Sequence, residues 1–434
     1  MAARWFARAT FLLVLAAAAT VIGFAGLESL GMVIVGAVGA CLTVAGGYMF
    51  LAHRGVLRLL GFAVVVLAPV AVLVIFALHN LIWVAVVSVG LVVLAIAAAQ
   101  RALASTALDP EMPAHDVPPP KHAFLIMNPK SGGGKVGTFG LKDKAEALGA
   151  EVALLDGPGV VDVAQLARQA VADGADLLGV AGGDGTQALV AGIAAENDLP
   201  FLVISAGTRN HFAMDLGLDR ENPAACLEAL TDGVEQRIDL GTIGERTFVN
   251  NASFGAYADI VESPAYRDDK AGTTLRMLPD ILSGHRGSKL TAHAGGTTIT
   301  GPQALLVSNN PYGMNDIAGL DRRARLDAGA LGVAAVTVNS ALQAIELLGG
   351  VHSRGLTALT AGEVVVDADT PQIPVGIDGE TVMMPTPVRC AIRPKVLRVR
   401  VPRNRPGVPR PKPVVDWPAL RQLASFRSAS AGPG

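Results

Sequence analysis

Four long apolar runs in the first hundred residues constrain this chain more than any other feature. They lie at about residues 9–27, 30–52, 59–78 and 80–99, and each is close to the roughly 20 residues that a helix needs to cross a bilayer core. A cleaved signal peptide would explain the first run together with Arg4 and Arg8, but it would not explain the three runs that follow. The sequence therefore predicts a transmembrane segment of four helices over residues 1–103.

Basic residues near the ends of these runs predict the orientation in the membrane. The flanks that would share one side hold Arg4, Arg8, Arg54, Arg58, Arg101 and Lys121. The opposite loops offer only Glu28, His79 and Asn80. Because basic residues favour the cytoplasmic side, we expect a multi-pass protein of the cell membrane whose two ends and catalytic part face the cytoplasm. The runs hold no ionisable residue except at their ends, which indicates an anchor rather than a transport pathway.

The composition fits a chain made of unlike parts. The chain is 51% hydrophobic and 17% charged, against about 25% charged residues in soluble domains, which argues against a disordered chain or a simple cytosolic globule. The net charge of −2 is the sum of +3 over residues 1–100, −14 over residues 101–392 and +9 over residues 393–434. The three cysteines are far apart and form no CxxC pair, so neither a disulfide framework nor a zinc site is expected.

The rest of the chain changes character several times. Proline-rich residues 104–121 predict a linker. In residues 122–240, apolar runs at 123–127, 151–155, 176–181 and 201–205 alternate with helical stretches, including 162–173 and one from about 187, which predicts an α/β domain with a parallel sheet. Residues 241–400 are rich in strand signals and glycine turns, so we expect a mainly antiparallel β domain. Residues 401–434 form a basic, proline-rich tail.

Three glycine-containing loops follow strands of the predicted parallel sheet. They read NPKSGGGK (128–135), GGDGT (182–186) and SAGTRN (205–210). In such sheets ligands bind beyond the carboxyl ends of the strands, and glycines let backbone N–H groups converge on an anion. The loops therefore predict a polyphosphate site, at which Asp184 either shares a Mg²⁺ ion with the phosphates or organises its loop. The first loop is not a Walker A sequence, and the GxGxxG match at 132–137 is a weak dinucleotide signal by itself.

Two carboxylates stand close together in the segment IDGE. Asp378 and Glu380 are two positions apart, so an extended backbone would project them to the same side. One carboxylate could take a proton from an acceptor hydroxyl while the other holds Mg²⁺. A D-G pair usually forms a surface turn, and these residues alone favour that interpretation over the catalytic one.

Taken together, NPKSGGGK, GGDGT, SAGTRNHFA, RIDLG, FVNNASFGAYADIV and IDGE, in this order, resemble the diacylglycerol kinase catalytic-domain family, which is distantly related to NAD kinase. The resemblance covers about residues 122–400 and implies a kinase that uses ATP and Mg²⁺ to phosphorylate a membrane lipid. It implies that Asp378 is the general base and that Glu380 supports the metal, and we predict Mg²⁺ binding by Asp184 and Glu380. With the loops, it predicts nucleotide binding by Asn128, Ser131, Lys135, Gly182, Gly183, Asp184, Gly185, Thr186, Gly207, Thr208 and Asn210.

The sequence departs from the family pattern at three places. The family often reads GGDGTxNE, whereas here Gln187, Ala188 and Leu189 follow Thr186, so the glutamate is absent. His211 stands where an aspartate is common. The segment LDAGALG retains Asp327 but has Ala328 and Gly332 at the other acidic positions of a family metal site. These changes put the structural metal in question while leaving Asp184, Asp378 and Glu380 in place.

Alternative functions remain at this stage. One is an NAD-kinase-like enzyme acting on a soluble metabolite, and another is a membrane-anchored protein that binds nucleotide or lipid without catalysis. The lipid acceptor and the oligomeric state, a homodimer included, are left open, and no nucleic-acid partner is expected.

The segment VVDWPALRQLASF predicts a short helix that docks on the α/β domain through Trp417, Leu420 and Leu423. The basic tail around this helix is either solvated or bound to anionic lipid.

Overall fold

The computed structural model divides the chain into two compact units. One unit comprises Met1–Pro110 with Pro411–Gly434, and the other comprises Glu111–Arg410. The residues that the structure describes are 2–25, 29–104, 112–157, 161–256, 288–312, 323, 325–337, 355–407, 415 and 417–425.

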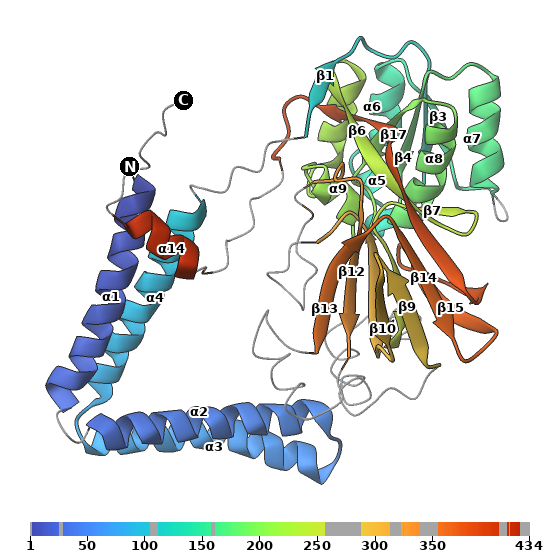
Figure 1. The fold of residues 1–434 in the computed structure, drawn as a ribbon. Helices are drawn as coiled ribbons and strands as arrows, with labels where there is room; N and C mark the ends of the chain where they lie inside the picture. The colour runs from blue at the N-terminus through green and yellow to red at the C-terminus, as the bar shows by residue number, and fades with distance from the viewer. Residues whose placement is uncertain are drawn as a thin grey trace, which may run out of the picture. The chain divides into compact units, whose positions relative to one another are not determined.

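The first unit contains the four predicted apolar helices (Figure 1). They are α1 (Ala2–Ala25), α2 (Ser29–Ala52), α3 (Val56–Leu78) and α4 (Ile82–Ala104). Each contains a stretch of 19 to 23 residues that is long and apolar enough to span a membrane. α1 packs along α4, and α2 packs along α3. Small residues permit the second contact, since a Cβ atom on Gly46 would lie 2.8 Å from Val64 and one on Gly61 would lie 2.5 Å from the backbone of Phe50.

The predicted C-terminal helix forms, but its docking partner differs from the prediction. Helix α14 (Trp417–Ala424) packs on α1 and α4 within the first unit, not on the α/β domain. Leu420 is buried against small residues of α1 and α4, and Trp417 meets Phe11 with ring centroids 6.0 Å apart. The prediction identified the apolar face of the helix correctly. It missed the partner because α1 and α4 present a strip of alanines whose shape the sequence pattern does not reveal.

The second unit contains the predicted parallel sheet. Strands β2 (Ala123–Met127), β3 (Glu151–Leu154), β4 (Leu177–Ala181) and β5 (Pro200–Ile204) are all parallel, in the order β3-β2-β4-β5. The helices between and after them are α5 (Lys135–Thr138), α6 (Leu141–Ala147), α7 (Val163–Ala172), α8 (Asp184–Glu196) and α9 (His211–Asp215). Two 3-10 helices, η2 (Ser131–Gly133) and η3 (Pro223–Leu230), complete this part. Because α8 begins at Asp184 rather than near residue 187, most of GGDGT forms its first turn.

The parallel sheet continues into antiparallel strands. The long strand β17 (Val388–Pro402) runs parallel to β5 at one end, and it pairs antiparallel with β14 (Glu363–Ala368) and with β6 (Gly233–Ile243). The remaining strands of this sheet are β1 (Ala114–Asp116), β7 (Arg246–Phe248), β9 (Leu290–Ala294) and β10 (Thr297–Thr300). Strand β1 comes from the predicted linker and pairs with β6, so part of the linker belongs to the sheet.

A second, fully antiparallel sheet packs against the extended end of the first. Its order is β13-β12-β11-β8-β15-β16. Its strands are β8 (Asn251–Gly255), β11 (Ala304–Asn309), β12 (Leu331–Val336), β13 (Leu356–Ala361), β15 (Gln372–Ile377) and β16 (Glu380–Pro385). Residues of both sheets form a common apolar core that is separate from the core of the α/β part. The predicted fold class, apolar helices followed by α/β and antiparallel β parts, is confirmed.

Candidate active site

The three glycine-containing loops meet at one edge of the parallel sheet. A Cβ atom on Gly132 would collide with the carbonyl oxygen of Ala206. A Cβ atom on Gly207 would lie 2.7 Å from the carbonyl oxygen of Gly182 and 3.1 Å from the Cα of Gly183. Glycine is required for this approach, at Gly132 also because its φ is +56°. The loops after β2, β4 and β5 are thus in mutual contact, as the parallel sheet led us to expect.

Several predicted nucleotide-binding residues shape these loops through their own bonds. Asn210 accepts from the Gly207 N–H at 2.8 Å and donates to the carbonyls of Ser205 and Gly207, at 3.0 and 2.7 Å. Asn128 accepts from the Lys130 N–H at 3.0 Å, and the Nζ of Lys135 donates to the carbonyl of Arg220 at 2.8 Å. These side chains hold the loop backbone. Ser131 starts η2 and is half-buried, whereas Thr208 is exposed beside the last loop.

Asp184 lies at the amino-terminal end of α8 with its carboxylate buried. Its Oδ2 accepts from the N–H of His211 at 3.3 Å, which links GGDGT to α9, while its Oδ1 is buried and has no hydrogen-bond partner. Burial raises the pKa of this carboxyl to about 6, although N–H groups of His211 and Phe212 oppose the shift. A buried carboxylate oxygen without a donor is costly. A bound cation would compensate this cost.

Asp378 lies in the turn between β15 and β16, with a φ of +46°. Its Oδ1 accepts from the N–H groups of Asn250 and Asn251, at 2.8 and 3.0 Å, and its Oδ2 accepts from the N–H of Val249 at 2.8 Å. Burial raises the pKa of Asp378 to about 7, with the nearby charge of Asp184 adding to the rise and the three N–H groups opposing it. The turn interpretation and the catalytic one are therefore compatible: the bonds orient the carboxylate, and Oδ2, with a single donor, keeps capacity for a proton.

Glu380 approaches α8 from the start of β16. Its Oε1 lies 2.8 Å from where a Cβ atom on Gly185 would stand, so a side chain at 185 would displace the carboxylate from the helix terminus. Asp184 precedes Gly185 in the chain, and Glu380 lies against Gly185 in space. Mg²⁺ is typically held in proteins by one or two carboxylates together with substrate phosphates, and these two side chains fit that donor set. No cluster of three or more potential ligands occurs among the described residues.

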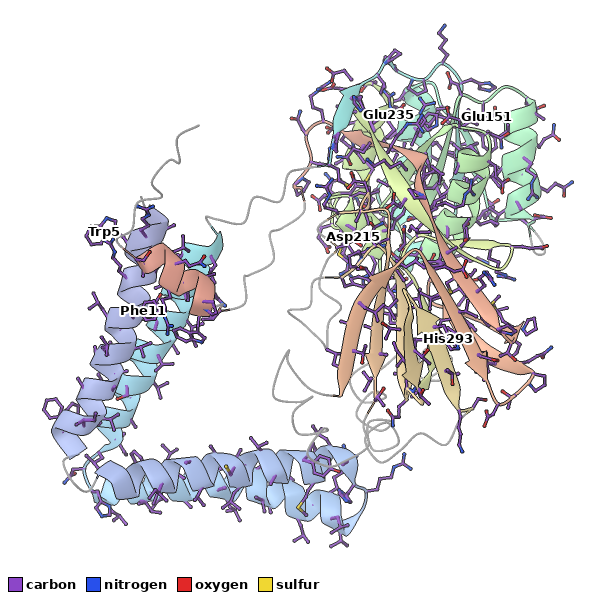
Figure 2. The ribbon with its side chains drawn as sticks, in the orientation of Figure 1. Trp5, Phe11, Glu151, Asp215, Glu235 and His293 are labelled. Atoms are coloured by element: carbon purple, nitrogen blue, oxygen red, sulfur yellow. The ribbon has the colours of Figure 1, made fainter. Side chains whose placement is uncertain are left out.

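Arg323 is a site residue that sequence reasoning missed. Its fully buried guanidinium pairs with Asp215 at 2.6 Å and donates to the carbonyls of Val249 and Asn309, at 2.6 and 2.7 Å, and to Asn250 at 2.8 Å. Figure 2 labels Asp215 where the helix-containing part meets the second sheet. Arg323 therefore fixes the same 249–250 segment whose N–H groups hold Asp378. Arg323 stands in the basic run DRRAR, and sequence alone does not distinguish a buried arginine of such a run from a surface residue.

The carboxylates of Asp327 and of Asp239 beside it both have hydrogen-bond donors. The Asp327 carboxylate receives two bonds from the guanidinium of Arg325, at 2.8 and 2.9 Å. The neighbouring Asp239 accepts from the N–H groups of Gly329 and Lys395, at 2.6 and 2.8 Å. The Asp327 carboxylate is thus paired with a guanidinium, and Asp239 is satisfied by backbone donors, so the groups present do not fit a structural metal at Asp327.

A cavity of about 890 Å³ opens from the carboxylates along α8. Gly185, Thr186, Asp378 and Glu380 form one end, and its walls come from α8, the β6–β7 turn and the β15–β16 hairpin. Such a volume falls within the roughly 300–1,000 Å³ of typical ligand sites. The structure thus brings the second predicted site segment, IDGE, to the helix that carries GGDGT.

Comparisons with known proteins agree with the resemblance drawn from the motifs. Residues 122–243 match the family model of the diacylglycerol kinase catalytic domain. A protein named diacylglycerol kinase from Mycobacterium tuberculosis (strain CDC 1551 / Oshkosh) is 35% identical over 120 residues, 27% of this chain and 39% of its own length. One of the same name from Bacillus subtilis is 33% identical over 169 residues, 38% of this chain and 54% of its own length. The chain thus spans about half or less of the length of these relatives.

A solved structure supports the fold over a longer stretch. A putative diacylglycerol kinase from Bacillus anthracis str. Sterne aligns with 65% of this chain and 98% of its own, with a TM-score of 0.51 and 17% identity. At this identity the likeness concerns the fold alone. The family match is confined to residues 122–243, and the fold match extends the likeness in fold over both the α/β and the β parts.

Proposed function

We propose that this chain, whose residues 122–243 match the diacylglycerol kinase catalytic domain, is a membrane-anchored lipid kinase that transfers the γ-phosphoryl group of ATP to a hydroxyl of a membrane lipid. The observation that carries the proposal is that Glu380 and Asp378 lie at the amino-terminal end of α8, which begins at Asp184 and where the charge of Asp184 acts on Asp378, beside three glycine-containing loops. The four apolar helices support a lipid rather than a dissolved acceptor, because an anchor keeps the active site at the surface where lipids are.

The loops and the helix terminus would hold the phosphates of ATP. N–H groups at the start of α8 have no partner within the helix and carry part of the helix dipole, so they attract anions. Gly183 precedes the helix without a side-chain cap, which leaves these donors available to a ligand. Asn128, Asn210 and Lys135 act indirectly here, by holding the loops in position.

The carboxylates divide the remaining work. Asp184 and Glu380 would hold Mg²⁺, which supplies neutralisation of the charge that develops on the transferred group. Asp378 would accept the proton of the lipid hydroxyl on Oδ2 as the hydroxyl oxygen attacks the γ-phosphorus and the bond between that phosphorus and ADP breaks. Positioning and charge neutralisation contribute most of the catalysis in such transfers, which suits a site without a covalent nucleophile.

The orientation of the chain is part of the proposal. Arg4, Arg8, Arg54, Arg58 and Arg101 would lie on the cytoplasmic side, where the second unit has access to ATP.

Incubation of the purified full chain with γ-labelled ATP and a total membrane lipid extract tests this function. We expect label in an organic-soluble product that mass spectrometry identifies as a lipid phosphate. The variant Asp184→Asn should abolish the label, and Asp143→Asn, an exposed aspartate in the first turn of α6, should retain it. Label in NADP⁺ after addition of NAD⁺ would indicate the soluble-metabolite alternative, and absence of any labelled product would indicate a binding protein.

A further inference from the structure

The first unit carries charge of one sign at the end where α14 docks. Every charged residue that the structure describes in this unit is an arginine. The contact of Leu420 with α1 and α4 places the start of α1 beside the end of α4 (Figure 1). At this end lies an arginine cluster, which consists of Arg4 and Arg8 on α1, Arg101 in the last turn of α4, and Arg421 on α14. No described carboxylate of the unit accompanies these guanidinium groups.

One arginine of the cluster already has a structural role. The Nε of Arg8 donates to the carbonyl of Ala424 at 3.2 Å, and its Cζ lies 5.5 Å from the centre of the Trp5 ring. The last carbonyls of a helix are unpaired and carry partial negative charge, so this bond caps α14. The other three arginines of the cluster are exposed, and their charge is therefore open to a partner outside the protein.

A cavity beside α14 is lined by hydrogen-bond donors. Its volume is about 440 Å³, and its described lining residues are Trp417, Pro418, Arg421, Gln422 and Ser425. Guanidinium, amide, hydroxyl and indole groups can all donate, and no carboxylate is among the described lining residues. A volume of this size can hold a small polar group, and a guanidinium recognises phosphate through paired N–H groups. The lining therefore fits an anionic phosphate group.

Two tryptophans indicate that this end lies where a bilayer meets water. Trp417, which contacts Phe11, is 49% exposed, and Trp5 is 65% exposed. Figure 2 labels Trp5 at the end of α1 that α14 covers. Indole rings are enriched at membrane surfaces because they combine an apolar ring with a polar N–H. The arginine cluster lies at the ends of the apolar stretches Ala3–Phe24 and Ile82–Leu103, which is the level of lipid headgroups.

We propose that α14 and the adjoining ends of α1 and α4 form a binding site for the headgroup of an anionic phospholipid, with Arg421 on the phosphate and Arg4 and Arg101 beside it. Charge complementarity carries the inference, because each basic residue at a membrane surface strengthens the attraction to anionic lipid about fivefold. The lipid is a bound ligand and not the phosphoryl acceptor. The site belongs to the first unit, so the inference rests on the membrane-spanning helices and not on the proposed kinase reaction.

Hydrogen–deuterium exchange at the backbone amides of residues 417–424 tests the site in the full chain in nanodiscs. A headgroup shared by α14, α1 and α4 should hold α14 in place, so exchange should be slower with phosphatidylglycerol present than in phosphatidylcholine alone. Arg421→Gln should need about fivefold more phosphatidylglycerol for half of the protection, with unchanged exchange in phosphatidylcholine alone. Equal exchange in both kinds of disc, or the wild-type midpoint in Arg421→Gln, would overturn the site.

The matched control is another arginine of the first unit. Arg58 lies on α3 with its Cζ 4.8 Å from the centre of the Phe50 ring, outside the arginine cluster. Arg58→Gln should therefore keep the wild-type midpoint. An equal shift in Arg58→Gln and Arg421→Gln would mean that the lipid responds to net charge alone, which contradicts a site on α14.

Three further arms identify the ligand and separate this inference from the proposed function. Inorganic phosphate added to phosphatidylcholine discs should give no protection, and protection by it would replace the lipid with a soluble anion. High salt should weaken the effect of phosphatidylglycerol because it screens charge, and salt-resistant protection would contradict recognition by arginine. Asp184→Asn, in which turnover should be lost, should retain the protection. The kinase proposal can therefore fail while the lipid site stands, and the reverse holds as well.

Discussion

The guanidinium of Arg323 and the carboxylate of Asp215 form a fully buried salt bridge of 2.6 Å that connects α9 to the segment holding Asp378. The Asp215 charge, offset in part by the desolvation of the guanidinium, keeps the pKa of Arg323 above its usual value. Arg323 also bonds to Val249 and Asn250, whose N–H groups orient Asp378. The Arg323 guanidinium thus connects α9, which follows β5, with the segment whose N–H groups orient Asp378.

Removal of one partner of this pair should destabilise the protein strongly. Asp215→Ala leaves a buried guanidinium without its counter-ion, which costs about 3–5 kcal/mol. We expect the thermal unfolding temperature of the detergent-solubilised chain to fall markedly. The double variant Asp215→Leu with Arg323→Met should recover part of the loss, because no unpaired charge then remains. Equal stability of Asp215→Ala and wild type would show that the pair contributes nothing.

Replacement of Asp378 should affect turnover more than nucleotide binding. In Asp378→Asn the amide cannot accept a proton, so we expect kcat to fall about 10²–10⁴-fold. An amide NH₂ would also face a backbone N–H of residues 249–251, so some loss of stability should accompany the change. Because the pKa of Asp378 is raised to about 7, wild-type kcat/KM should rise with pH up to about 7 and then level off. A flat profile below pH 7 would remove Asp378 as the base.

Stability should change with pH in the direction opposite to activity. Burial raises the pKa values of Asp184 and Asp378 from 3.8 to about 6 and about 7. The folded chain therefore retains protons that the unfolded chain has released, and its stability decreases as pH rises from about 4 to about 7. Thermal unfolding at a series of pH values should show this decline, and Asp184→Asn should flatten it. Added Mg²⁺ should raise the unfolding temperature more at pH 8 than at pH 5, where protons occupy these carboxylates.

Contact between the loops should depend on glycine at position 132. Gly132→Ala places a methyl group against the Ala206 carbonyl at a φ of +56°, so the loops after β2 and β5 must separate. A displacement of about 1 Å at a phosphate site can reduce activity by up to about 100-fold. The control is Gly137→Ala, where a Cβ atom has open space and the helix α5 accepts alanine. Kinetics with varied ATP should show a raised KM in the first variant only.

Docking of α14 on the transmembrane helices should depend on Leu420. Leu420→Asp places a charge against Ala7, Ala99 and Ala102, and the helix should detach even though the Nε of Arg8 donates to the Ala424 carbonyl at 3.2 Å. Detachment should increase the rate of hydrogen–deuterium exchange at the backbone amides of residues 417–424 in detergent micelles. The exposed neighbour Gln422→Asp should exchange at the wild-type rate. Equal rates for all three chains would show that α14 is not held by this contact.

The sequence by itself determined the elements and the kind of chemistry. Hydrophobic runs of bilayer length, alternating strands and helices, and glycine loops after strands 123–127, 177–181 and 200–204 are local patterns with local physical causes. They were sufficient for the four helices, the parallel sheet and the shared edge of GGDGT and the other two loops. They also identified Asp378 and Glu380 as candidate catalytic residues, although a local pattern could not distinguish a surface turn from a catalytic site.

Tertiary structure alone decided what depends on residues far apart in the chain. It brought Glu380 against Gly185 and the N–H groups of 249–251 onto Asp378, and it placed Arg323 between α9 and the second sheet. It gave α14 to the transmembrane helices rather than to the α/β part, and it joined Leu189 and Met383 in one cavity. Burial and shape complementarity arise from packing, and packing joins residues whose spacing in the sequence carries no period. For this reason the charges and apolar walls of the site became visible only in three dimensions.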